Sequence, residues 1–309
     1  MPLHPQAQVI VDAANAAPAI APSDERLADI RAAYAMLLLV TGDPTLTDAP
    51  RELDADGVPV RVYAPREAPD LPIVVYFHSG GWTIGTAEQF DGIARLVARA
   101  ADAIVVSVDY RLAPEHPFPA AVDDAWDALN WVERNAASFG GDATRLAVMG
   151  ESAGGNLAAV CALAARDARR PNLALQVLVY PVCDCDFTTP SYRENGVGYL
   201  LSEQTMRWFF SCYVRGDADP TDPRISPLRH RDVQGVAPAL VITAEYDPLR
   251  DEGEAYARRL AEAGVPVHKR RFDGMIHQFF GMVTVLDDAR TAVELVGTEL
   301  RRAFGTLVG

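Results

Sequence analysis

Short continuous apolar runs alternate with longer amphipathic stretches along most of the chain. The strand candidates lie at residues 73–77, 104–108, 146–149, 175–180, 239–244 and 265–272, and most of them are such apolar runs. Runs of this length, most of them rich in valine, are typical of strands that are covered on both faces. The stretches with helical periodicity lie at residues 88–101, 120–137, 156–169, 249–263 and 287–304. This alternation predicts an α/β fold with a mostly parallel central sheet and helices on both faces.

Three segments depart from this alternation. Residues 23–40 predict a helix that begins at the N-cap Ser23 and has a broad apolar side, and Asp56-Gly57 predicts a hairpin at the edge of the sheet. Residues 184–230 form a long insertion, within which residues 202–214 predict a capped helix with an aromatic face. Long insertions in compact domains usually serve as lids or binding elements. We therefore expect the N-terminal helix and the insertion to form a cap over the carboxyl ends of the strands.

These patterns divide the chain into a cap and a core. The expected parts are N-terminal cap helices at 1–45, a first core part at 46–183, a cap insertion at 184–230 and a second core part at 231–309.

The charge balance narrows the range of partners. The chain has 309 residues with 42 acidic and 28 basic side chains, which leaves a net charge of −14. A surplus of negative charge disfavours nucleic acids and anionic membranes as partners. No apolar run approaches the ~18 residues of a membrane span, so we expect no stable membrane association.

The cysteines and the N-terminus favour a cytoplasmic protein. Cys161, Cys183, Cys185 and Cys212 are too few and too irregularly spaced for a disulfide framework or a zinc site, so we expect reduced thiols and no metal. No basic segment followed by an apolar core opens the chain, which predicts no secretory signal.

A serine lies in a glycine-rich turn between a predicted strand and a predicted helix. Gly150-Glu151-Ser152-Ala153-Gly154 fits the G-x-S-x-G pattern of a serine nucleophile. A turn this sharp forces the serine into strained backbone angles, and its neighbours must lack side chains that would collide. The alternative is an ordinary glycine turn in which the serine only caps the helix.

Candidate partners for this serine follow other strands, because open α/β sheets bind ligands beyond the carboxyl ends of their strands. Asp247 follows the run at 239–244, where it is also a natural N-cap with Pro248 at the first helical position. The chain order Ser, acid, His leaves His268 and His277 as candidate bases. His268 lies within the last strand pattern, whereas His277 follows it, so we favour His277.

The segment after residues 73–77 reads His78-Ser79-Gly80-Gly81-Trp82. Its glycines leave backbone N–H groups open to approach, as an oxyanion-binding loop requires. The alternative is a glycine turn beside a structural histidine.

Together these motifs resemble the hormone-sensitive lipase family of α/β-hydrolases, the bacterial family IV esterases. The resemblance rests on the serine elbow, the loop at 78–82, the segment at 109–124, the segment at 247–253 and His277, and it covers nearly the whole chain. It implies an α/β-hydrolase fold with a helical cap. The catalytic residues it implies are Ser152, Asp247 and His277, with an oxyanion hole formed by the N–H groups of Gly80, Gly81 and Ala153.

Two positions depart from the family pattern. Ser79 replaces the first glycine of the usual His-Gly-Gly-Gly loop, and Gln278 follows the histidine where glycine is common. The candidate substrate-binding residues are Trp82, Trp208, Phe209 and Tyr213, whose rings would close an apolar pocket. The alternative is that the aromatic residues of the insertion only hold the cap helix in place.

The resemblance implies a serine carboxylesterase that hydrolyses small-molecule esters with short to medium acyl chains through an acyl-enzyme, without cofactor or metal. The same machinery cleaves amides, so an amidase or formamidase is the alternative. A ligand-binding protein with an inactive triad is disfavoured because all three triad residues are present. Related esterases often dimerise through the edge of the last strand, and residues 265–271 could form a homodimer in this way.

Overall fold

A single eight-stranded sheet organises the computed structural model, which describes residues 2–17, 21–43 and 45–307. Its strands lie in the order β1-β2-β4-β3-β5-β6-β7-β8. Their bounds are β1 (Arg51–Ala55), β2 (Val58–Tyr63), β3 (Leu71–Phe77), β4 (Ile104–Val108), β5 (Gly141–Glu151), β6 (Leu173–Val179), β7 (Ala239–Tyr246) and β8 (Val267–Ile276). The strands from β4 to β8 in this order are parallel, whereas β2 pairs with β1 and with β4 in the antiparallel sense.

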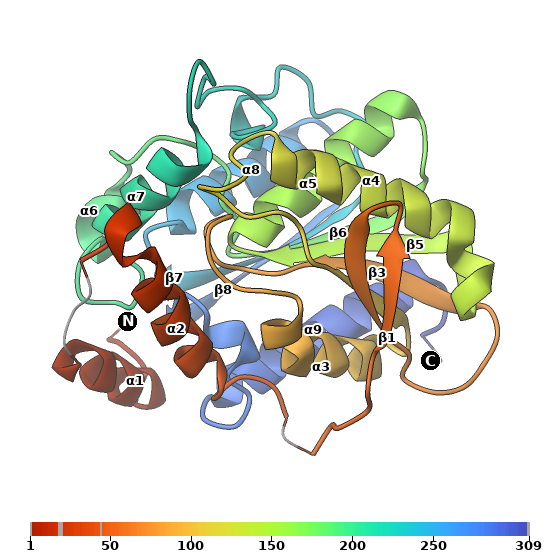
Figure 1. The fold of residues 1–309 in the computed structure, drawn as a ribbon, viewed down its shortest axis with the longest axis horizontal. Coiled ribbons are helices and arrows are strands. Elements are labelled where there is room, and N and C mark those ends of the chain that lie inside the picture. Colours follow the sequence, from red (N-terminus) through yellow and green to blue (C-terminus); the bar gives the residue numbers. More distant parts are fainter. Residues whose placement is uncertain (1, 18–20, 44, 308–309) are drawn as a thin grey trace.

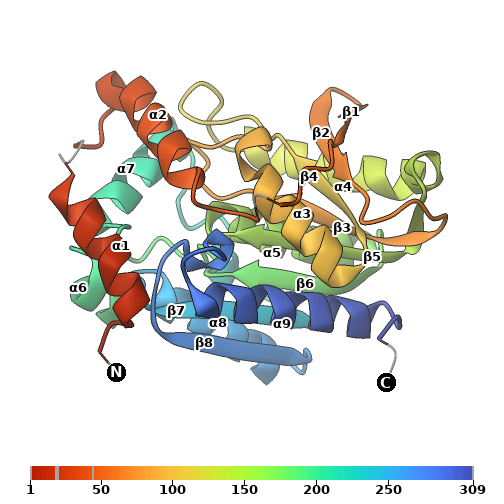
Figure 2. The ribbon, with the colours of Figure 1, turned by 90° about the horizontal axis from the view of Figure 1, so that it is seen from below.

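Helices cover both faces of the sheet (Figures 1 and 2). On one face, α4 (Ala120–Asn135), α5 (Ala153–Ala168) and α8 (Arg250–Glu262) contribute to one apolar cluster. On the other face, α3 (Asp91–Ala101) and α9 (Asp287–Ala303) contribute to a second cluster. Every residue of β3 is buried, since its successive side chains enter the two clusters in turn. The predicted fold class, an α/β sheet covered on both faces, is therefore confirmed.

Two helices from distant parts of the sequence lie together at one end of the molecule (Figures 1 and 2). α2 (Leu27–Leu38) lies beside α7 (Glu203–Tyr213) in both views. The Trp208 indole donates a hydrogen bond of 3.1 Å to the carboxylate of Asp24, directly before α2, and Arg215 forms an ion pair with the same carboxylate. Residues almost two hundred positions apart thus join into one layer.

Two helices were not predicted from the pattern. α1 (Pro5–Ala16) buries only Ala7 and Val11, so its apolar periodicity is weak. α6 (Pro190–Asn195) has six residues, which is too short for a helical period to emerge. No helix in the described ranges combines the length and the apolar character that crossing a bilayer requires.

Candidate active site

Ser152 stands on a sharp turn between β5 and α5. Its backbone has φ 56° and ψ −117°, a strained conformation for a residue with a side chain. A Cβ atom on Gly150 would lie 2.1 Å from the carbonyl oxygen of Gly154, and one on Gly154 would lie 2.0 Å from that of Phe77. The turn is therefore closed only because both positions are glycine. The serine side chain is held at the N-terminus of α5, where the helix dipole favours negative charge.

The candidate acid and the candidate base come from the ends of β7 and β8. Asp247 directly follows β7 and is fully buried, and His277 directly follows β8 and is 4% exposed. One carboxylate oxygen of Asp247 accepts a hydrogen bond of 2.8 Å from the N–H of Leu249. α8 begins only at Arg250, with Leu249 at its N-cap position, so the prediction that Asp247 is the N-cap of this helix is wrong. Asp247 instead caps the turn ahead of the helix.

The structure brings these three side chains into one hydrogen-bonded series. The second oxygen of Asp247 lies 2.7 Å from Nδ1 of His277, and Nε2 of His277 lies 3.1 Å from Oγ of Ser152. A carboxylate only accepts hydrogen bonds, so Nδ1 carries the proton and the lone pair of Nε2 faces the serine. His268, the other candidate, is exposed on β8 and paired with Glu299.

The loop that follows β3 faces the serine with open backbone groups. Gly80 and Gly81 have φ values of 123° and 58°, and the carbonyl of Gly80 accepts hydrogen bonds of 3.0 and 2.9 Å from the N–H groups of Thr83 and Ile84. Within the part of the chain that the structure describes, the hydrogen bonds found do not use the N–H groups of Gly80 and Gly81 as donors. Both groups are therefore available to an oxygen that carries developing charge.

His78 supports this loop from beneath. Its ring is fully buried and stacks on Tyr110 at 4.3 Å between ring centroids and on Phe90 at 5.3 Å. Burial lowers the pKa of His78, so the imidazole stays neutral at physiological pH. The Tyr110 hydroxyl donates a hydrogen bond of 2.8 Å to the His78 carbonyl. His78 thus has a structural part in the loop, and Tyr110 braces it.

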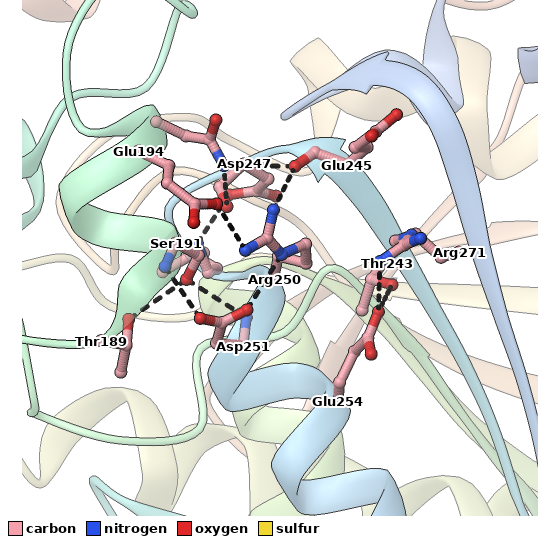
Figure 3. A network of polar contacts seen from close by, with 12 residues as sticks. Thr189, Ser191, Glu194, Thr243, Glu245, Asp247, Arg250, Asp251, Glu254 and Arg271 are labelled. Carbon is pink, nitrogen blue, oxygen red and sulfur yellow. Dashed lines mark hydrogen bonds and ion pairs between the residues drawn. The ribbon is translucent and has the colours of Figure 1, made fainter. Parts of the chain in front are cut away.

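The cap also holds the segment that carries Asp247 (Figure 3). From α6, the Ser191 hydroxyl donates to the Pro248 carbonyl at 2.6 Å, and its N–H donates to the Asp251 carboxylate at 2.8 Å. Arg250 reaches back to Glu194 at 2.9 Å. These contacts hold in place the segment that directly follows Asp247.

A cavity of about 130 Å³ opens beside the serine. Its walls are Tyr34, Leu37, Ser79, Gly80, Gly81, Ile84, Ser152, Leu200, Leu201, Thr205, Phe209, His277 and Gln278. Of the four aromatic residues predicted to bind substrate, this lining includes Phe209 and not the other three. Trp82 stacks on Tyr213 at 4.3 Å in the core, and Trp208 turns to Asp24. Trp82 lies in the loop after β3 and Tyr213 lies on α7, so their stacked rings join these two segments. Trp208 instead joins α7 to the turn before α2.

Glu151, beside the nucleophile, is a buried acid that sequence reasoning did not single out. Its two oxygens accept hydrogen bonds of 2.6 Å from the hydroxyls of Tyr76 and Tyr180. The Tyr180 ring lies 4.7 Å from the imidazole of His277, between centroids. Burial raises the pKa of Glu151, against the two hydroxyl donors that lower it. The variable position of the G-x-S-x-G pattern carried no signal for this contact.

Comparison with known proteins shows which family the chain belongs to. Residues 74–281 match the family described as alpha/beta hydrolase fold. The chain is 44% identical over 269 residues to carboxylesterase NlhH of Mycobacterium tuberculosis, and this match covers 84% of each of the two chains. It is 39% identical over 254 residues to an arylesterase of Saccharolobus solfataricus, and this match covers 82% of each of the two chains.

Solved structures give the same result. A hyperthermophilic esterase from the archaeon Pyrobaculum calidifontis superposes with a TM-score of 0.91 at 39% identity, covering 98% of this chain and 99% of that one. The chain therefore belongs to the alpha/beta hydrolase fold family and, within it, to the hormone-sensitive lipase-like carboxylesterases.

Proposed function

We propose that the protein hydrolyses small carboxylic esters with short to medium acyl chains through an acyl-enzyme on Ser152. The observation that carries this proposal is the series from Asp247 through His277 to Ser152, with contacts of 2.7 and 3.1 Å. Such a series turns a weakly nucleophilic hydroxyl into a reactive oxygen.

In the first step, Oγ of Ser152 attacks the ester carbonyl carbon while its proton passes to Nε2 of His277. Asp247 holds the imidazole in the required tautomer and stabilises the imidazolium that forms. The tetrahedral intermediate then collapses, the bond to the alcohol oxygen breaks, and His277 returns the proton to the leaving alcohol. The acyl group stays on Ser152.

In the second step, a water molecule takes the place of the alcohol. His277 accepts a proton from this water, whose oxygen attacks the acyl carbon, and then returns a proton to Oγ of Ser152. The carboxylic acid leaves and the serine is restored.

The proposed oxyanion hole consists of the N–H groups of Gly80, Gly81 and Ala153. The first two lie in the open loop after β3, and the third lies in the first turn of α5, where helix N–H groups lack partners within the helix. Removal of one oxyanion donor costs about 3–4 kcal/mol of transition-state stabilisation in comparable enzymes. The hole therefore contributes on the same scale as the triad.

The size of the cavity supports short acyl groups. An apolar cavity of about 150 Å³ accommodates a molecule of the size of benzene, and the cavity beside Ser152 measures about 130 Å³. Leu37, Leu201 and Phe209 supply apolar walls from both cap segments. These contacts also support the division into a cap (1–45 and 184–230) and a core (46–183 and 231–309).

A cytoplasmic location and a homodimer complete the proposal. All four cysteines lack disulfide partners, as expected for reduced thiols. β8 is the last strand of the sheet, so its outer edge could pair with the same strand of a second copy. Light scattering on the purified protein measures the mass directly, and a monomer at all concentrations would rule the dimer out.

The decisive test is Ser152→Ala with a short p-nitrophenyl ester. We expect no measurable turnover from this variant and unchanged thermal unfolding. Ser138→Ala, which removes an exposed hydroxyl before the start of β5 whereas Ser152 follows its end, is the matched control and should keep full activity. A fluorophosphonate should label the wild type on Ser152. Near-normal turnover by Ser152→Ala would refute the proposed nucleophile.

A further inference from the structure

Three polar side chains from distant parts of the chain meet in the wall of the catalytic cavity. They are Tyr34 of α2, Ser79 of the oxyanion loop and Gln278, which follows His277. The Tyr34 hydroxyl donates to Oγ of Ser79 at 3.3 Å, and the Gln278 amide donates to the Tyr34 hydroxyl. We call this arrangement the tyrosine bridge. It joins the two positions at which the sequence departs from the pattern of its family.

Each end of the bridge lies next to a proposed catalytic group. Ser79 directly precedes Gly80, and Gln278 directly follows His277. Gln278 has φ 66°, a left-handed conformation that glycine adopts at lower cost. The chain therefore keeps a side chain where its backbone favours glycine, and that side chain is used in the bridge.

Tyr34 is suited to the central place. Desolvation by burial raises its pKa above the ordinary value, so the phenol stays neutral and serves both as donor and as acceptor. Its ring also contacts Phe90, with 6.3 Å between centroids. A phenylalanine at this position would keep the ring contact and lose both hydrogen bonds.

α2 packs on the core with the partly buried apolar side chains of Leu27, Ile30, Tyr34 and Leu37, and it adds polar contacts. Leu38 is its one buried residue. Arg31 forms two hydrogen bonds of 2.7 and 2.8 Å with Glu115 and one of 3.1 Å with the carbonyl of Thr83. Elements with few buried apolar contacts open at low free energy. The bridge is therefore one of the attachments that hold α2 over the cavity.

We propose that Tyr34 is a positioning residue, which couples closure of α2 over the cavity to the placement of the oxyanion loop and of the segment that carries His277. This inference rests on the proposed esterase function. When the bridge is made, α2 closes the cavity and Ser79 is restrained beside Gly80. When it is broken, both the loop and the cavity wall loosen together.

The test is Tyr34→Phe, with Tyr199→Phe as the matched control. Loss of the hydroxyl leaves the polar groups of Ser79 and Gln278 unpaired, which corresponds to about a tenfold fall in kcat/KM for p-nitrophenyl butyrate. The preference for butyrate over octanoate should also fall, because a loosened α2 enlarges the cavity. Tyr199→Phe keeps its ring against Tyr246 and should behave as wild type. Equal thermal unfolding of the variants shows that the effect is not a loss of fold.

A double-mutant cycle with Ser79→Ala separates coupling from two independent losses. If the hydroxyls act together, the double variant should be no slower than Tyr34→Phe alone. Additive losses, an unchanged chain-length preference, or a kcat/KM of Tyr34→Phe within twofold of wild type would each overturn the inference. A wild-type protein that is inactive on all esters would instead refute the proposed function.

Discussion

Gly80→Ala tests the oxyanion loop at its tightest point. Gly80 has φ 123°, and a Cβ atom there would lie 1.9 Å from the carbonyl oxygen of Ile84. Real Cβ atoms essentially never come closer than 3.0 Å to such an atom, so the two groups would have to separate by more than 1 Å. The carbonyl of Gly80 also accepts the hydrogen bonds that close this turn. The substitution therefore cannot be accommodated without moving the loop.

The expected loss follows from this displacement. A shift of about 1 Å in a catalytic group costs roughly 100-fold in rate, and loss of one oxyanion donor costs about 100- to 1000-fold. We therefore expect kcat of Gly80→Ala to fall by about 100- to 1000-fold, which corresponds to roughly 3–4 kcal/mol. The strained φ adds a cost of about 1–3 kcal/mol to folding.

The assay is kcat at saturating p-nitrophenyl acetate, together with thermal unfolding. Gly57→Ala is the control for backbone strain, because Gly57 has φ 101° in the β1–β2 turn and its Cβ would meet nothing within 4 Å. It should lose stability and keep its kcat. If Gly80→Ala retained kcat within threefold of wild type, the loop would not hold the oxyanion.

Three further substitutions test buried acids. Asp247→Asn should lower kcat by about 10⁴-fold in the same assay, because an amide favours the wrong tautomer of His277; a loss below tenfold would contradict this. Glu151→Gln should lower kcat by about tenfold, because an NH₂ group then replaces one of the two oxygens that accept hydrogen bonds from Tyr76 and Tyr180. An unchanged kcat would show that these hydrogen bonds do not position His277. Burial raises the pKa of Glu252 well above its ordinary value of 4.5, so the folded protein binds this proton more tightly than the unfolded chain does. The tighter proton binding stabilises the folded protein fully below pH 4.5. This stabilisation is lost as the pH rises through the pKa of Glu252 in the folded protein. In urea titrations, the free energy of unfolding of Glu252→Gln should therefore be higher than that of the wild type at pH 8 and equal to it at pH 4. A lower value for the variant at pH 8 would refute the predicted direction.

Much of the fold could be predicted from local patterns. The apolar runs predicted the parallel strands, and Asp56-Gly57 predicted the β1–β2 hairpin at the sheet edge. The observed strands extend beyond the runs; β5, for example, starts at Gly141 rather than at residue 146. The first part of β5 contains polar residues, because the continuous buried stretch of this strand starts only at Leu146.

The candidate site was predictable where its residues occupy strand ends. Ser152, Asp247 and His277 each follow a strand, so their meeting at one edge follows from a parallel sheet. The pocket residues were less predictable. Aromatic residues on α7 share one helix, and only packing decides that Phe209 faces the cavity while Trp208 faces Asp24.

The sequence by itself determined which segments become strands and helices and where a serine elbow can form, because those features depend on local backbone chemistry and apolar periodicity. The tertiary structure alone decided the strand order, the contact between His277 and Ser152 across 125 positions, and the placement of Tyr34 between Ser79 and Gln278. The physical reason is that contacts between distant segments arise from the packing of the whole chain. No local pattern specifies which distant side chain a residue will meet.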